Sequence, residues 1–474
     1  MIAEDVCFAS IREQGALLRS RKLSAVELAE GCLDRLEKLG PRLGAVVTLT
    51  RERALGQAHR ANQELLAGHD RGPLHGIPYG AKDLLATRGI PTTWGAEPLR
   101  QQVFDHDAAV VERLEQAGAV LVAKLAMVEL AGGLGYNNPD ASFTGPGRTP
   151  WNTDYWSGGS SSGSAAAVAA GLVSFAIGSE TSGSILTPSA FCGVTGLRPT
   201  YGLVSRHGAM ALCWTLDKLG PLARSADDAA LVLQAIAGPD PRDPTTGESF
   251  RYRERPQATR RFRLGVLRDA TLDCDPDVKT NFEHAAAALR DVADLETDVP
   301  LPELPYREAV SLIVDAEGGA ALRPLIESGA VHKLQDAADR LGGYAMLATR
   351  AADYLDAQRS RVAMRAQLDK LLSRFDAVIA PTRARLAPPI GRDFDAPAPG
   401  GPPSAEAAGP HPPATIPAGN LAGLPAIALP NGFGANRLPT SLQLLGRALS
   451  EARLVAVADA YQQLTDWHRQ RPPL

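Results

Sequence analysis

The sequence predicts an α/β fold, because helix-like and strand-like stretches alternate along it. Residues 107–118 have helical periodicity, with Asp107 placed to cap the first turn and Gly118 at the end. The apolar run 119–123 (AVLVA) follows directly and is typical of a short buried strand, as is 173–177. A helix that leads into a buried strand indicates a layered α/β domain.

The other elements support the same class. Ser24 opens an amphipathic helix that ends at Gly40, and Glu27 completes a capping box with it. Small residues at 164–171 (SAAAVAAG) predict a short helix that approaches other backbones closely. Two strands, at 424–430 and 441–445, and a helix at 451–467 close the chain.

Composition limits the partners and the compartment. The 474 residues are 45% hydrophobic, which is enough for a large core, and the net charge is only −4 without any basic block. We therefore expect no nucleic-acid partner. No run approaches about 18 apolar residues, so we expect no membrane partner either. The five cysteines, Cys7, Cys32, Cys192, Cys213 and Cys274, are widely spaced, which favours free thiols and a cytoplasmic location.

Two turns rich in glycine and serine are the main candidates for a site. They are 157–164 (SGGSSSGS) and 179–185 (SETSGSI), on either side of the short helix and strand. Glycine lets several backbone N–H groups converge on one point, which is what a tetrahedral oxyanion requires. A flexible linker is the alternative for such a composition. Strong helix and strand patterns on both sides favour the site.

A competing hypothesis uses the same residues differently. Residues 159–163 (GSSSG) fit the GxSxG nucleophile elbow, which would make Ser161 the nucleophile with a histidine and an acid downstream. The preceding residues 151–157 (WNTDYWS) are not an apolar strand, so the context fits poorly. None of the candidate histidines lies in a distinctive motif: His207, His284, His332, His411 and His468.

Lys82 is the candidate base for a serine nucleophile. It lies in 76–83 (GIPYGAKD), among apolar residues and glycines. A lone lysine is most often a solvated surface residue. A lysine in a desolvated pocket, however, loses its proton more easily and can activate a serine hydroxyl.

Together these segments resemble the amidase signature family. Similar stretches are the Gly/Ser run 158–167, the turn 179–186, the segment 190–200 (AFCGVTGLRPT), the upstream 76–83 and 420–430 (NLAGLPAIALP). The likeness extends from about residue 23 to the C-terminus. It implies a single large domain with a central, mixed, twisted β-sheet covered by helices on both faces.

The resemblance implies a role for each matched residue. Lys82 corresponds to the catalytic lysine, Ser160 to a bridging serine that follows a cis peptide bond, and Ser184 to the acylated nucleophile. The backbone N–H groups of Thr181, Ser182, Gly183 and Ser184 would form the oxyanion hole. Neither a metal nor an organic cofactor is required.

The resemblance places one wall of the substrate site at Ala131, Gly132, Gly133 and Tyr136, and we expect a second wall at Cys213 and Trp214. The alternative for each of these residues is an ordinary place in the core. The sequence departs from the family pattern at Ser162, Glu180, Ser182 and Leu186. These changes put in doubt the hydrogen bonding of the nucleophile turn and any binding of a substrate carboxylate.

The expected activity is hydrolysis of carboxamide C–N bonds in small neutral or aryl amides, extending to carbamates and esters. The alternative is the ammonia-producing subunit of a multi-subunit amidotransferase. We expect one domain over 1–474, as a monomer or homodimer. Its parts would be a catalytic core at about 70–225, a variable excursion at about 238–310, an Ala/Pro/Gly loop at about 396–417 and a closing segment at about 420–474.

Overall fold

The fold is built on one mixed sheet of 11 strands in the order β1-β3-β2-β4-β6-β5-β10-β11-β9-β7-β8. A computed structural model describes residues 2–252, 261–394 and 414–474. The strands are β1 Val46–Leu49, β2 Pro78–Lys82, β3 Val120–Leu125, β4 Phe175–Glu180, β5 Thr195–Arg198, β6 Lys218–Ala223, β7 Phe262–Leu267, β8 Ala293–Val299, β9 Ala377–Pro381, β10 Ala426–Phe433 and β11 Pro439–Leu445.

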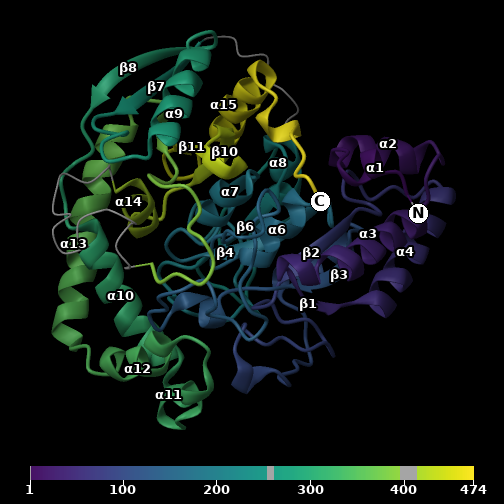
Figure 1. The fold of residues 1–474 in the computed structure, drawn as a ribbon, viewed down its shortest axis with the longest axis horizontal. Helices are drawn as coiled ribbons and strands as arrows, with labels where there is room; N and C mark the ends of the chain where they lie inside the picture. The colour runs from purple at the N-terminus through teal and green to yellow at the C-terminus, as the bar shows by residue number, and fades with distance from the viewer. Residues whose placement is uncertain (1, 253–260, 395–413) are drawn as a thin grey trace.

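Helices cover both faces of this sheet, and α10 to α13 form a further layer at one end of the molecule (green, Figure 1). The α-helices are α1 Glu4–Cys7, α2 Ile11–Arg19, α3 Ala25–Leu39, α4 Arg51–Leu66, α5 Ala109–Gln116, α6 Ser162–Ala169, α7 Leu186–Cys192, α8 Ala226–Ile236, α9 Pro276–Leu289, α10 Tyr306–Ala321, α11 Arg323–Glu327, α12 Ala337–Met346, α13 Ala351–Leu372, α14 Thr415–Leu421 and α15 Glu451–Leu464. In the described residues no helix is long and apolar enough to cross a membrane.

The strands pair in both directions, as a mixed sheet requires. β2 runs parallel to both of its neighbours, β3 and β4, and β7 runs parallel to β8 and β9. Antiparallel pairs join the centre, from β4 through β6 and β5 to β10 and β11. The parallel β2–β4 pair is the part that positions the site, because both Gly/Ser turns and Lys82 lie at its carboxyl edge.

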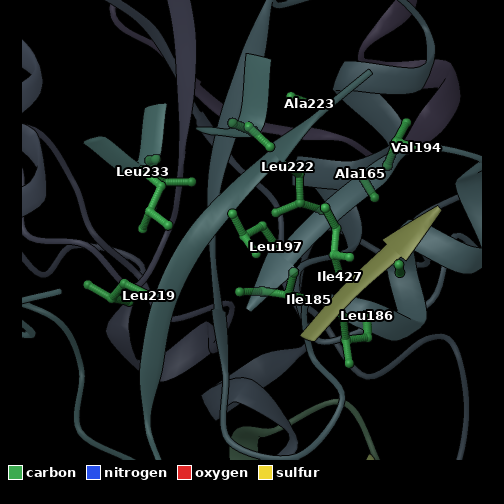
Figure 2. Close-up of a cluster of buried hydrophobic side chains, with 14 of the residues drawn as sticks. Ala165, Ile185, Leu186, Val194, Leu197, Leu219, Leu222, Ala223, Leu233 and Ile427 are labelled. Atoms are coloured by element: carbon green, nitrogen blue, oxygen red, sulfur yellow. The ribbon is translucent and has the colours of Figure 1, made fainter. Parts of the chain in front are cut away.

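A buried apolar cluster contains the C-terminal end of the second Gly/Ser turn. Ile185 and Leu186, which end this turn, lie among Leu197, Leu222 and Ile427 from three different strands (Figure 2), and all five side chains are fully buried. The turn is therefore fixed to the sheet by its own C-terminal residues. Burial of one such side chain stabilises the fold by about 1.5–3 kcal/mol.

Most predicted elements are confirmed, and one predicted cap is wrong. Ser24 caps α3 with Glu27 as a capping box. Asp107 does not cap α5, since Ala108 is the N-cap and makes no side-chain hydrogen bond. The Asp107 carboxylate instead binds Arg53 of α4, at 2.8 and 2.9 Å. An ion pair with a residue far away in the sequence has displaced the local cap.

The predicted excursion and the predicted loop can be compared with the structure in part. The expected excursion at 238–310 contributes β7, α9 and β8 to one end of the main sheet, so much of it is regular structure. Of the loop at 396–417, residues 396–413 lie outside the described residues, as does His411. Its last residues are not loop, because α14 begins at Thr415.

Candidate active site

Lys82 is the last residue of β2 and is fully buried at the centre of the site. Its Nζ lies 2.7 Å from the hydroxyl oxygen of Ser160 and 2.9 Å from that of Ser179. Ser160 comes from the first Gly/Ser turn, and Ser179 from β4, the strand beside β2. The amine therefore joins the two segments that sequence analysis singled out.

The environment of Lys82 favours its neutral form. Burial lowers the pKa of this amine to about 7, although the negative charges of Asp217 and Glu180 act in the opposite direction. An isolated lysine has a pKa near 10.4, so the same amine would be far more basic in water than it is in the site. Near neutral pH a large share of Lys82 is uncharged, and an uncharged amine can accept a proton from a hydroxyl.

The first Gly/Ser turn is tightly constrained just before Ser160. The Gly159–Ser160 peptide bond is cis, and Gly158 has a φ of +80°. A side chain at position 158 would place its Cβ 2.7 Å from the Cα of Pro188 in α7, so only glycine fits there. The N–H of Ser161 donates to the carbonyl of Ser184 at 3.3 Å, and this bond brings the two turns together.

The side chain of Glu180, at the start of the second turn, binds the backbone at the end of the same turn. One carboxylate oxygen accepts from the N–H groups of Ile185 and Leu186, at 2.8 and 3.0 Å. The other oxygen accepts from Arg198 at 2.9 Å and from Asn420 at 2.8 Å. Burial acts to raise the pKa of Glu180, but the Arg198 charge and these hydrogen bonds outweigh it and lower the pKa. The departure from the family pattern at this position therefore still leaves a carboxylate that anchors the C-terminal end of the turn.

The second turn presents main-chain donors at its apex. In the part of the chain that the structure describes, no acceptor lies against the N–H groups of Ser182, Gly183 and Ser184. Gly183 has a φ of +94°, which other residues adopt only with strain. The side chain of Thr181 is fixed by a 2.6 Å hydrogen bond to Asp217. Free N–H groups beside a serine hydroxyl are suited to stabilise an oxyanion.

Ser161, the nucleophile of the competing hypothesis, is arranged differently. Its hydroxyl is fully buried, donates to the carbonyl of Ser179 at 3.2 Å and accepts from the N–H of the same residue at 3.3 Å. These bonds tie the start of α6 to β4. Ser184, by contrast, is only half-buried and lines a cavity.

That cavity has a volume of about 700 Å³, and Thr181, Ser182 and Ser184 of the second turn line it. Of the residues predicted to bind substrate, Ala131, Gly132 and Tyr136 line it. Its aromatic wall also includes Trp156, Phe191 and Phe394, and the Trp156 and Phe394 rings lie 4.8 Å apart. An aryl group would find stacking partners here.

Three other residues of the predicted wall lie elsewhere. Gly133 packs behind the cavity against Leu212, and it is not in the described lining. Trp214 is also outside this lining and is 47% exposed, with its carbonyl accepting from Tyr201. The thiol of Cys213 is buried and donates to Glu317.

Sequence reasoning missed several residues that the fold brings to the site. Ser179 is the first residue of the turn 179–185, but no motif indicated that its hydroxyl would contact Lys82. The aromatic residues Trp156, Phe191 and Phe394 lie in three separate segments. The expected strand ended at residue 177, so no local pattern indicated that the Ser179 hydroxyl would be buried against Lys82.

A buried ion pair explains the aspartate that follows Lys82. Asp83 and Lys124 are both fully buried, and Asp83 Oδ1 lies 2.9 Å from the Lys124 amine. The other oxygen of Asp83 accepts from the N–H and the hydroxyl of Thr93. This network fixes the end of β2 against β3, and with it the backbone that carries Lys82.

The fold and the two serine turns define the class of protein, which is a serine hydrolase. Comparison with known proteins extends this. The sequence model of the Amidase family matches residues 27–455. A glutamyl-tRNA(Gln) amidotransferase subunit of Thermosynechococcus vestitus is 36% identical over 492 residues, which cover 98% of this chain and 99% of that protein.

Solved structures agree with the family match. The native peptide amidase from Stenotrophomonas maltophilia has a TM-score of 0.85 at 33% identity, over 98% of both chains. A bacterial aryl acylamidase of the amidase signature family has the same TM-score of 0.85 at 23% identity, which shows the fold alone. The chain therefore belongs to the amidase family, as its motifs predicted, and it is an amidohydrolase.

Proposed function

We propose that this amidohydrolase cleaves its substrate through an acyl-enzyme on Ser184, with Lys82 as the base and Ser160 as the bridge. Neutral Lys82 accepts the proton of the Ser160 hydroxyl. The Ser160 oxygen in turn accepts the proton of the Ser184 hydroxyl. The Ser184 oxygen attacks the amide carbonyl. The relay then returns a proton through Ser160 to the leaving amine.

Main-chain donors complete the site. The N–H groups of Thr181 to Ser184 would stabilise the negative charge that develops on the carbonyl oxygen, each contributing about 3–4 kcal/mol. Water then hydrolyses the acyl-enzyme by the reverse of the same relay. Every step uses side chains and backbone groups of this chain, and no metal or organic cofactor takes part.

The observation that carries this proposal is the buried contact of Lys82 with Ser160. A charged amine without a carboxylate partner is costly to bury, and the cost falls when the amine is neutral. A neutral Lys82 can donate one N–H to Ser179 and still accept the proton of Ser160. The 2.7 and 2.9 Å contacts fit this double role.

The cavity supports aryl amides as substrates. Its aromatic wall of Tyr136, Trp156, Phe191 and Phe394 would bury one flat ring next to Ser184. The same relay would act on carbamates and esters of similar shape, since the attacked carbonyl is common to all three. We further propose a cytoplasmic monomer or homodimer, in keeping with the free cysteines of the described residues.

The test is a panel of amides, carbamates and esters, with trapped acyl groups located by mass spectrometry. We expect the label on Ser184, and we expect Ser184→Ala to lower kcat/KM at least about 1,000-fold. Ser161→Ala is the matched control, because the hydroxyl of Ser161 bonds to the backbone of Ser179 in β4, and it should retain most of the activity. Label on Ser161 would overturn the assignment.

A second candidate is the amidase subunit of a multi-subunit amidotransferase that supplies ammonia to a partner, and the curated relatives favour it. A glutamyl-tRNA(Gln) amidotransferase subunit from a Roseiflexus strain is 38% identical, over 97% of this chain and 96% of that protein. Glutamine would then be the amide that is cleaved, and the ammonia would pass to a partner protein. Affinity purification of this chain from its native cells, followed by glutaminase assays of the isolated chain and of any complex, separates the two candidates.

A further inference from the structure

A second cavity adjoins the aromatic one at the nucleophile turn. It has a volume of about 450 Å³ and lies between the end of β9, α10 and the start of α14. Ser182, Arg383 and Arg385 line both cavities, so the two are continuous beside Ser184. A substrate held at this turn could extend into both.

The second cavity is strongly cationic. Arg307, Arg383 and Arg385 line it, and its described lining includes no aspartate or glutamate. Arg385 is neutralised from outside by Asp273 at 2.7 Å and by Asp275 at 3.7 Å. The other two arginines thus supply the net charge of the cavity.

The guanidinium groups of Arg383 and Arg307 are available to an anion. Among the residues that the structure describes, neither guanidinium has a hydrogen-bond or ion-pair partner, and both side chains are exposed to solvent. The positive charge of Arg307 acts on Arg383, so the two cations repel each other. An anion between them would relieve this repulsion.

We propose that Arg383, assisted by Arg307, binds a carboxylate of the substrate, so that the enzyme acts on amides with an aryl group at one end and a carboxylate at the other. A guanidinium presents a fork of N–H donors that matches a carboxylate. The aromatic cavity takes the ring, the cationic cavity takes the carboxylate, and the scissile carbonyl lies between them at Ser184. This differs from the uncharged substrate that the sequence suggested, and it rests on the relay proposed above.

The test compares two anilides that share a leaving group. Succinyl-4-nitroanilide carries a terminal carboxylate, and 4-methylpentanoyl-4-nitroanilide has an uncharged branch of the same shape. Release of 4-nitroaniline gives kcat/KM for each. We expect the wild-type enzyme to prefer the succinyl compound at least about 10-fold, mainly through a lower KM, because a hydrogen bond to a charged group contributes roughly that much.

The variants then assign the preference to one residue. In Arg383→Gln the ratio of the two kcat/KM values should fall about 10- to 100-fold. Arg383→Lys, which keeps the charge without the fork, should retain part of the preference. Arg359→Gln is the control, since Arg359 is 84% exposed on α13 and lies outside both described linings.

Each outcome has a distinct meaning. If the wild-type enzyme cleaves both anilides equally and Arg383→Gln leaves the ratio unchanged, the carboxylate site is wrong while the relay stands. If Arg359→Gln lowers the ratio as much as Arg383→Gln does, the effect is one of overall charge and the site is again wrong. If mass spectrometry finds no acyl group on Ser184 with any substrate, the proposed relay is wrong, and this inference is wrong with it.

Discussion

The carboxylate of Glu180 lies 2.9 Å from the guanidinium of Arg198, and both side chains are fully buried. The same carboxylate accepts hydrogen bonds from the N–H groups of Ile185 and Leu186, at the start of α7. One ion pair thus anchors the turn that carries Ser184 to β5, although β6 lies between β4 and β5 in the sheet. The pair couples the stability of the core to the geometry of the site.

We therefore expect Glu180→Gln to destabilise the protein by about 3–5 kcal/mol, because it leaves the Arg198 charge buried without its partner. Denaturant unfolding measures this. The control is Asp294→Asn, which breaks an ion pair between Arg261 and Asp294 in which Asp294 is 69% exposed, and it should cost less than about 1 kcal/mol. Equal losses in the two variants would show that the buried pair has no special role.

The pH dependence of the reaction should follow Lys82. The amine must be neutral to act as a base, and its pKa is lowered to about 7 by burial. We therefore expect kcat/KM to be constant above about pH 8 and to fall about tenfold per pH unit well below pH 7. Stopped or continuous assays between pH 5 and 9, on a substrate without an ionisable group, measure the profile.

Lys82→Arg separates charge from basicity at this position. An arginine keeps a cation but cannot lose its proton in this range, so activity should fall at least about 100-fold at every pH. Circular dichroism checks that the variant is folded. A wild-type profile that is flat from pH 5 to 9, or an active Lys82→Arg enzyme, would mean that another group is the base.

Ser179 should act as a positioning residue for Lys82. Its hydroxyl is the second partner of the amine, at 2.9 Å, and it lies on the strand beside β2. Ser179→Ala removes this partner while Ser160 remains, so we expect kcat to fall about 5- to 10-fold with KM little changed. Ser179→Thr keeps a hydroxyl and should restore part of the rate. A change confined to KM would place Ser179 in substrate binding.

Some parts of this site could be predicted from the sequence, and others could not. Lys82, Ser160 and Ser184 each lie in a local motif, so the segments that carry them were identifiable before their distances were known. Asp107 met the local rule for a cap, but Arg53 competes for it from another helix. Arg383 carries no motif at all. It follows β9, which four strands separate from β4 in the sheet, so only the tertiary fold places Arg383 and Ser184 in the lining of one cavity.

The stability of the protein should depend on pH through a buried acid, Asp339. Asp339 of α12 is fully buried close to Glu129, the first residue of the short 3-10 helix Glu129–Gly132 that lines the aromatic cavity. Burial, and next the negative charges of Glu129 and Asp336, raise the pKa of Asp339 to about 9. The carboxyl is therefore neutral in the native protein at pH 7, whereas in the unfolded chain it ionises near pH 4.

The native state thus holds this proton more tightly than the unfolded state, so its stabilising effect is complete below about pH 4 and is lost as pH rises toward about 9. Asp339→Asn stays neutral throughout and should escape this loss. We expect its Tm, relative to wild type, to rise steadily between pH 5 and pH 9. Asp356→Asn, at a site 77% exposed, should show no such trend. If the Tm difference for Asp339→Asn is the same at both ends of this range, Asp339 is ionised in the native protein.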